Sequence, residues 1–430
     1  MIASDYEWFV DGLIVGGAEY FSGEGAREDV GVVAVNDHTL EIRLTRPCGY
    51  FMQIASFPTY KPVKKDFVEQ FGDAYGSEAD KVLGNGPFIL DSWEAGMQAV
   101  YVPNPNYWDK DNVHLDRIER KIVKEENSRA QALLTGELDA AGIAEPQWRE
   151  MLDAEGDYAY INQAGASVEF FMYNQQNKYL KNTKIRQALS LAFDRERYIK
   201  EIMDDFGFAA NSVVPPVVHA GEQLYIDVTK GENEVVKTLA KNNPDVKALL
   251  IEGLKEEGLS ANPADMEITM MTRGTGEWIK KSAEWIQQMY KEELGINLQI
   301  EMVPWNVMWD NVDSGTYEIA VGGWTADVDD PTNLIDIFHT EKGYYHKDKL
   351  SWTGDRADAF NAFIDESVTV NDPLDKAELF LAAEKILVGD AVIAPMYFRE
   401  TSSYRRNYVK NNYSNPFTYQ DYVGVFIAEN

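Results

Sequence analysis

The stretch MEITMMTRGTGEWIKKSAEWIQQMYKEELGINLQIEMV, residues 266 to 303, decides the fold class. Its first seven residues read as a strand, and the segment from Glu277 reads as a helix that Gly295 ends. The last eight residues alternate apolar and polar side chains, as in a half-buried strand. Two strands joined through a helix are parallel when they are neighbours in a sheet. The sequence therefore predicts an α/β fold.

The same alternation of strands and helices continues on both sides of this stretch. We expect strands over residues 168–176, 317–324 and 391–398, and helices over residues 182–202, 305–312 and 373–387. Asn182 or Thr183 is the expected N-cap of the helix over 182–202.

The first third of the chain favours hairpins instead. Residues 30–45 alternate on both sides of an Asn36-Asp37 turn, and residues 84–108 contain two strand-like runs around Gly96. A strand over 117–123 and a helix capped by Asn127 or Ser128 and ended by Gly136 follow. Residues 1–22 read as a short helix with apolar Trp8, Phe9, Leu13 and Ile14, and no strand precedes it.

Composition excludes several classes of function. The 430 residues suggest two or three domains, and 71 acids against 40 bases give a net charge of -31, which repels nucleic acid. Cys48 has no partner for an internal disulfide, and the five histidines lack metal-ligand spacing. Motifs for a nucleophile or a phosphate cradle are missing as well, so we expect no cofactor and no metal. The first residues, MIASDYEWFV, lack the basic start and apolar stretch of an export signal, so we expect none within the sequence as it stands.

The segment GGWTADVDDP, residues 322–331, places three acids after an expected strand, where open α/β sheets bind ligands. A calcium loop fits poorly, because the usual Gly and late Glu are absent. A glycosidase pair would need a second carboxylate that the sequence does not locate. A turn built by Asp329, Asp330 and Pro331, with Asp327 capping amides, is the plain structural alternative. The remaining possibility is that one acid binds an ammonium group beside Trp324.

Aromatic residues gather near the ends of the expected strands in the second half. These are Trp305, Trp309, Trp324, Tyr397 and Phe398. Such rings line many ligand pockets, and they also fill protein cores. The sequence leaves both roles open.

Five segments, spread over nearly the whole chain, resemble the peptide- and nickel-binding family of extracytoplasmic solute-binding proteins that serve ABC importers. The oligopeptide-binding proteins are the most similar group. The segments are NDHTLEIRLTRPCGYF (36–51), GNGPFILDSWEAGMQAVYVPNPNYW (84–108), LDRIERKIVKEENSRAQALLTGELDAA (115–141), NTKIRQALSLAFDRERYI (182–199) and GGWTADVDDP (322–331).

This resemblance implies a two-lobed, type II periplasmic-binding-protein-like fold with a small extra subdomain, its N-terminal portion missing. The implied parts are a subdomain remnant (1–78), the first lobe (79–177), the second lobe (178–399) and a return to the first lobe (400–430). Ligand would lie between lobes that close over it.

The resemblance also implies site residues. Asp327 matches the aspartate that grips the peptide's α-amino group, and Trp305 and Trp324 match aromatic pocket residues. Tyr397 and Phe398 lie on a strand expected to reach the cleft. Val312 and Val321 stand where relatives can have arginines for the peptide carboxyl group. This departure favours a ligand longer than the pocket or one without a carboxylate.

By this resemblance the chain is a monomeric, non-enzymatic binding component that captures peptides and delivers them to an ABC permease. It would act in the periplasm or lipid-anchored on the outer face of the cytoplasmic membrane. A nickel complex, haem or an oligosaccharide are alternative ligands within the family. A glycoside hydrolase is the alternative from another class.

Overall fold

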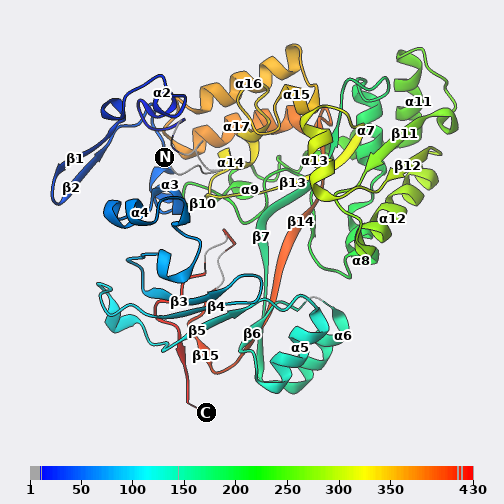
Figure 1. Ribbon diagram of the computed structural model, residues 1–430. Coiled ribbons are helices and arrows are strands. Elements are labelled where there is room, and N and C mark those ends of the chain that lie inside the picture. The colour runs from blue at the N-terminus through cyan, green and yellow to red at the C-terminus, as the bar shows by residue number, and fades with distance from the viewer. Residues whose placement is uncertain (1–9, 11, 144, 414–415, 418–419, 430) are drawn as a thin grey trace. The chain divides into compact units, whose positions relative to one another are not determined.

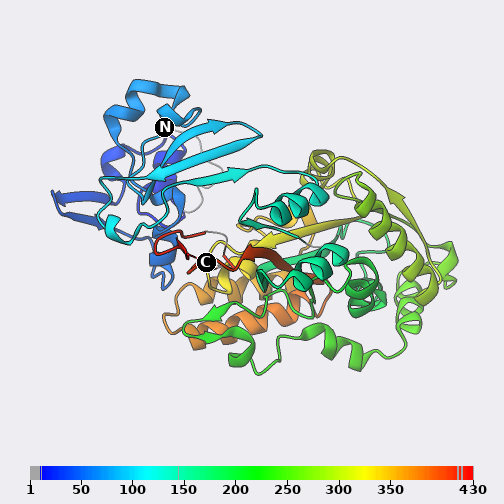
Figure 2. The same ribbon diagram turned by 90° about the horizontal axis from the view of Figure 1, so that it is seen from below.

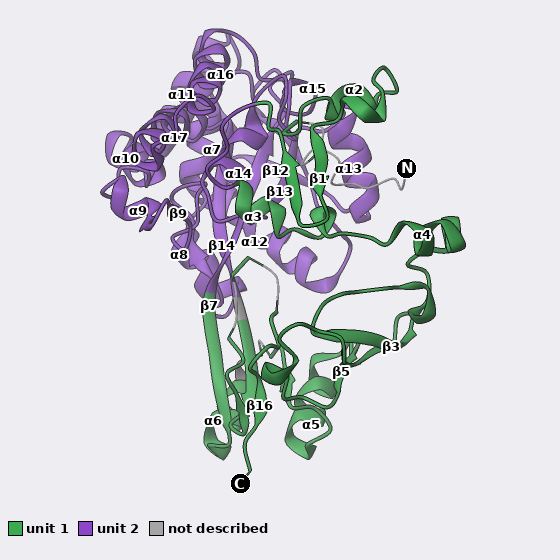
Figure 3. Cartoon of the chain, turned by 90° about the vertical axis from the view of Figure 1, so that its left-hand side faces the viewer, with its two compact units in different colours: residues 1–45, 51–163, 401–430 green, residues 46–50, 164–400 purple. Residues whose placement is uncertain are grey.

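The chain divides into two compact units (Figure 3). The computed structural model describes residues 10, 12–143, 145–413, 416–417 and 420–429. Unit 1 contains residues 1–45, 51–163 and 401–430, and unit 2 contains residues 46–50 and 164–400. The chain passes between the units within two long strands, β7 (Tyr158–Tyr173) and β14 (Ile393–Arg406). The finer division at residues 78 and 177 stays a prediction.

The sheet of unit 2 runs in the order β12-β11-β13-β7-β14. The predicted strand–helix–strand unit is confirmed: α12 (Glu277–Glu293) joins β11 (Glu267–Met271) to β12 (Asn297–Glu301), and the two strands are parallel. β13 (Ile319–Thr325) pairs in parallel with β11 and antiparallel with β7. β7 and β14 lie side by side in Figure 1.

Helices and short strands accompany this sheet. They are α7 (Thr183–Ala192), α8 (Arg195–Ile202), α9 (Tyr225–Val228), α10 (Val235–Asn242), α11 (Val246–Glu256), α13 (Trp305–Asp313), α14 (Thr332–Ile335), α15 (Lys347–Leu350), α16 (Asp355–Ser367), α17 (Pro373–Leu387), β8 (Phe208–Ala209), β9 (His219–Ala220) and β10 (Gln223–Leu224). One of the short strands, β8, pairs with β14. One core cluster joins Phe171 and Tyr173 of β7 to Leu189 and Tyr290 of the helices. This burial of large apolar side chains fixes the sheet against its helices.

The expected single helix over residues 182–202 is two helices. Asn182 caps α7 as predicted, accepting hydrogen bonds from the amides of Lys184 and Ile185. Asp194 then caps α8 by accepting from the amide of Arg197 at 3.0 Å. A second N-cap inside the periodic stretch interrupts the helix that the spacing of apolar residues predicts.

Unit 1 is built from hairpins and two-helix packing. Its elements are α2 (Gly17–Phe21), β1 (Val32–Asn36), β2 (Thr39–Ile42), α3 (Phe51–Ala55), α4 (Lys65–Phe71), β3 (Phe88–Glu94), β4 (Gln98–Pro103), β5 (Ile118–Lys121), α5 (Glu126–Thr135), β6 (Ala140–Ala141), α6 (Pro146–Glu155), β15 (Val409–Lys410) and β16 (Phe426–Ile427). Both predicted hairpins are confirmed, and β5 extends the second one to the three strands seen in cyan in Figure 2. Of the helix expected over residues 1–22, Val10 and Gly17–Phe21 are helical among the described residues, and Trp8 and Phe9 lie outside them.

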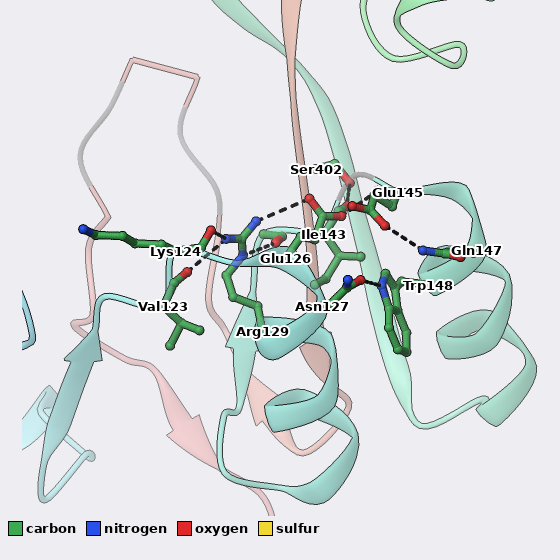
Figure 4. Close-up of polar contacts among 11 residues, drawn as sticks. Val123, Lys124, Glu126, Asn127, Arg129, Ile143, Glu145, Gln147, Trp148 and Ser402 are labelled. Atoms are coloured by element: carbon green, nitrogen blue, oxygen red, sulfur yellow. Dashed lines mark hydrogen bonds and ion pairs between the residues drawn. The ribbon is translucent and has the colours of Figure 1, made fainter. Parts of the chain in front are cut away.

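The start of α5 differs from the expectation, as Figure 4 shows. The N-cap is Glu125, not Asn127 or Ser128, although Gly136 ends the helix in the left-handed conformation as predicted. The Asn127 side chain instead accepts a hydrogen bond from the indole of Trp148 at 2.6 Å. A contact with α6 therefore uses the oxygen that a cap would need.

Candidate ligand-binding site

The acidic loop follows directly from the carboxyl end of β13. Pairing with β7 continues beyond the strand, because the amide of Ala326 donates to the carbonyl of Ala166 at 2.8 Å. The hydroxyl groups of Thr325 and Ser167 lie 2.6 Å apart on the two strands. This pairing fixes where the chain leaves the sheet, so the loop begins at a defined point of unit 2.

Asp327 is a half-buried acid without a cationic partner. Burial raises the pKa of its carboxyl group to about 6, against a smaller lowering by a hydrogen bond with the Asn333 side chain. The side-chain oxygen of Asn333 also accepts from the Asp327 amide at 2.6 Å, which positions the acid. Within the described part of the chain, no lysine, arginine or histidine forms an ion pair with Asp327. The carboxylate is therefore desolvated without an opposite charge to balance it, and the hydrogen bond with Asn333 offsets only part of the shift.

The other two acids have structural partners. Asp329 accepts a hydrogen bond from the amide of His219 at 2.7 Å and lies 2.8 Å from its ring Nδ1. Asp330 accepts from the amide and the hydroxyl of Thr332, at 2.9 Å and 2.5 Å. These contacts agree with the expectation that Asp329 and Asp330 shape the loop.

Three of the predicted aromatic residues belong to one chain of ring contacts. Trp324 lies 5.2 Å from the ring of Tyr344, which in turn lies 6.0 Å from Trp309. Trp305, at the start of α13, contacts Trp309 at 6.0 Å and is 61% exposed. Its exposure leaves a face of the indole free to contact a ligand.

Tyr397 and Phe398 are both only 5% exposed on β14. Tyr397 stacks on Tyr198 with ring centres 5.9 Å apart, and Phe398 pairs with Phe208 of β8. Both side chains thus have extensive protein contacts already. Their expected role in ligand binding stays a prediction.

Sequence reasoning missed a charged group on the same sheet. Glu169 of β7 is 1% exposed and pairs with Arg273, which follows β11, at 2.5 Å between Oε2 and Nη1. Arg399 of β14 pairs with its other oxygen. Burial raises the pKa of Glu169, and the two arginines oppose that shift. A charged residue inside the apolar run VEFFMY was the available signal.

A small cavity borders this group. Its lining includes Arg273, Tyr198, Ser282 and Tyr397, and its volume is about 30 Å³. That volume holds a few water molecules at most. The cavity is therefore too small to enclose more than a small chemical group.

Neither a metal site nor a membrane span is found where the structure is described. No group of three or more His, Cys, Asp and Glu side chains there could hold a metal ion. None of the helices that can be described has both the length and the apolar character needed to cross a bilayer.

Comparison with known proteins identifies the family. The model of "Bacterial extracellular solute-binding proteins, family 5 Middle" matches residues 2–346. The chain belongs to solute-binding protein family 5. Among curated family members, it is 30% identical to the oligopeptide-binding protein OppA of Bacillus subtilis over 379 residues, which are 88% of this chain and 67% of OppA. It is 29% identical to the dipeptide-binding protein DppE of the same organism, covering 96% of this chain and 73% of DppE.

Solved structures of the family confirm the fold. Listeria monocytogenes OppA bound to peptide has a TM-score of 0.74 and 26% identity, over 99% of this chain and 80% of that one. The OppA of Burkholderia pseudomallei, at 19% identity, shares the fold with a TM-score of 0.77 over 99% of this chain and 81% of that one. The expected type II periplasmic-binding-protein fold is therefore confirmed. Members of family 5 are described as extracellular, which agrees with the expected location outside the cytoplasm.

Proposed function

We propose that this protein is the binding component of an ABC importer, and that it captures peptides and delivers them to the permease subunits. Relatives named for oligopeptide and dipeptide binding support this function. Within this protein, the support comes from Asp327. We further propose that it acts as a monomer outside the cytoplasmic membrane, in the periplasm or held by a lipid anchor.

The half-buried carboxylate of Asp327, which has no ion-pair partner among the described residues, is the observation that carries the proposal. An acid with a pKa raised by burial gains more from a bound cation than an exposed acid does. The α-ammonium group of a peptide supplies that cation and three hydrogen-bond donors. Trp324, three residues earlier and beside Tyr344, adds aromatic surface near the charge. We infer that Asp327 holds the amino terminus of the ligand.

The contacts of the other acids favour binding over hydrolysis. A glycosidase needs two carboxyl groups free to reach substrate from opposite sides. Asp329 and Asp330 are held by His219 and Thr332 and so do not supply the second group. This supports a non-enzymatic role for the site.

Peptides with blocked and free amino ends test the proposal. A ligand at about 100 times its Kd adds roughly 2.7 kcal/mol of stability, so a thermal shift with short peptides detects binding. Calorimetric titration of the best peptide then compares the free form with its N-acetylated form. We expect the acetylated form to bind more weakly by about 2 kcal/mol, or roughly thirtyfold, because the ammonium group is lost.

The matched variants are Asp327→Asn and Asp355→Asn. Asp327→Asn should bind the free peptide as weakly as the native protein binds the acetylated one. Asp355 is exposed at the start of α16, and its replacement should leave affinity unchanged. Equal affinity of native protein and Asp327→Asn for the free peptide would refute the role of Asp327.

A further inference from the structure

Four neighbouring strands bring three charged side chains together on one face of the unit 2 sheet. In the order β11-β13-β7-β14, Arg273 follows β11, Glu169 lies on β7 and Arg399 lies on β14. The strand between β11 and β7 contributes Gly323, which lies directly opposite Glu169. A Cβ atom at Gly323 would come within 2.7 Å of the Glu169 carboxylate. The glycine therefore leaves the space that lets Arg273 reach across β13 to Glu169.

The charges of this group do not cancel. Two guanidinium groups face one carboxylate, so the net charge is about +1 when all three are ionised. This local excess stands out in a chain with a net charge of -31. A buried ion pair contributes little to stability compared with apolar packing. The need to fold therefore does not explain why Glu169 has two arginine partners and not one.

Both arginines keep donors available for a further partner. A guanidinium group has five N–H donors, and among the residues described here only Glu169 forms an ion pair with either arginine. The Arg399 side chain is 49% exposed and that of Arg273 is 21% exposed, whereas Glu169 is 1% exposed. Glu169 thus orients the arginines from the buried side and leaves their outer edges open.

Gly323, which lies opposite Glu169, belongs to β13, the strand that leads to Asp327. Gly323 and Asp327 are four residues apart, so the two centres of opposite charge are separated by up to about 13 Å along the chain. An extended peptide of about four residues has its ammonium and carboxylate groups at a similar separation. The carboxylate of an acidic side chain, at a ligand residue nearer the peptide's amino end, could also reach the two arginines.

We propose that Arg399 and Arg273 bind a carboxylate of the ligand, while Glu169 positions both guanidinium groups. This inference rests on the proposed function, because Asp327 defines the face that receives the ligand. It differs from the sequence-based expectation drawn from Val312 and Val321, since the cations come from other strands. The carboxylate is supplied by the ligand's carboxyl terminus or by an acidic side chain.

Three tetrapeptides with a free amino end separate these sources in calorimetric titrations. They are Ala-Leu-Ala-Phe as the free acid, the same peptide as its C-terminal amide, and the amide of Ala-Leu-Glu-Phe. We expect the first amide to bind native protein at least tenfold more weakly than the acid. Recovery of affinity with the glutamate peptide identifies an acidic side chain as the source, and no recovery identifies the carboxyl terminus.

The variant Arg399→Gln should lose the tenfold difference between acid and amide. The matched control is Arg356→Gln, because Arg356 forms a two-point ion pair with Asp390 at an exposed position of α16 and should not affect this difference. A native protein that binds acid and amide equally, or an Arg399→Gln variant that keeps the difference, overturns the inference. If native protein binds none of the three peptides, the proposed function itself fails and the inference fails with it.

Glu169→Gln gives a second test should Arg399→Gln not fold. Removing the competing negative charge should increase the preference for acid over amide severalfold. An unchanged or smaller preference in a folded Glu169→Gln protein counts against the inference. Thermal unfolding of each variant without ligand establishes that it is folded.

Discussion

Acidification should weaken peptide binding through one group, Asp327. Its pKa is raised to about 6 in the protein without ligand, because burial disfavours the charged form. The ionised acid binds an ammonium group and the protonated acid does not. Affinity should therefore be full above pH 6 and should fall as the pH drops through 6.

The size of the effect follows from competition between the proton and the ligand. With a pKa of about 6, about nine tenths of the Asp327 carboxyl groups are ionised at pH 7 and about one tenth at pH 5. The apparent Kd should thus rise roughly tenfold between pH 7 and pH 5, or about 1.4 kcal/mol. The peptide does not contribute to this change, because its amino group titrates near 8 and its carboxyl group near 3.5.

Calorimetric titrations at pH 7, 6 and 5 measure this dependence with a free peptide and with its N-acetylated form. Asp327→Asn is the control, because every other titratable group of the protein is retained in that variant. Native protein with the free peptide should show the tenfold loss, and the variant should show a flat profile. A flat profile in native protein, or an equal loss in Asp327→Asn, would refute the assignment of the ammonium site.

Two further variants test the energetics of unit 2. Burial raises the pKa of Glu384 from its usual 4.5 to about 8, so its protonated form stabilises the folded state fully below pH 4.5, and this contribution is lost as the pH rises to 8. Urea unfolding at pH 5 and pH 8.5 should show a smaller loss in Glu384→Gln than in native protein, and an equal loss would contradict the reasoning. Gly323→Ala places a methyl group against the Glu169 carboxylate and should lower stability by about 1–3 kcal/mol. The same variant should also reduce the preference for peptides with a carboxylate, and a protein with native stability and native preference would show that the contact is easily relieved.

Local patterns in the sequence determined the elements that depend on short-range chemistry. The alternation on either side of α12 predicted two parallel strands, and Gly96 and Gly136 marked a turn and a helix end that the structure contains. Such signals work because side-chain periodicity and backbone conformation are set within a few residues. Predictions failed where a distant contact competed, as when the Asn127 side chain binds Trp148 and does not cap α5.

The same distinction between local and long-range information applies to the residues of the candidate site. Asp327 and Trp324 could be found from the sequence, because both lie in one short segment after a recognisable strand. The group formed by Glu169, Arg273 and Arg399 could not, since its members are more than 100 residues apart and become neighbours only through the strand order β11-β13-β7-β14. Strand order depends on the packing of the whole unit, which no local pattern encodes. The sequence by itself determined the α/β class and singled out Asp327 as a candidate ligand-binding acid, and the tertiary structure decided where the nearby group of positive charge lies.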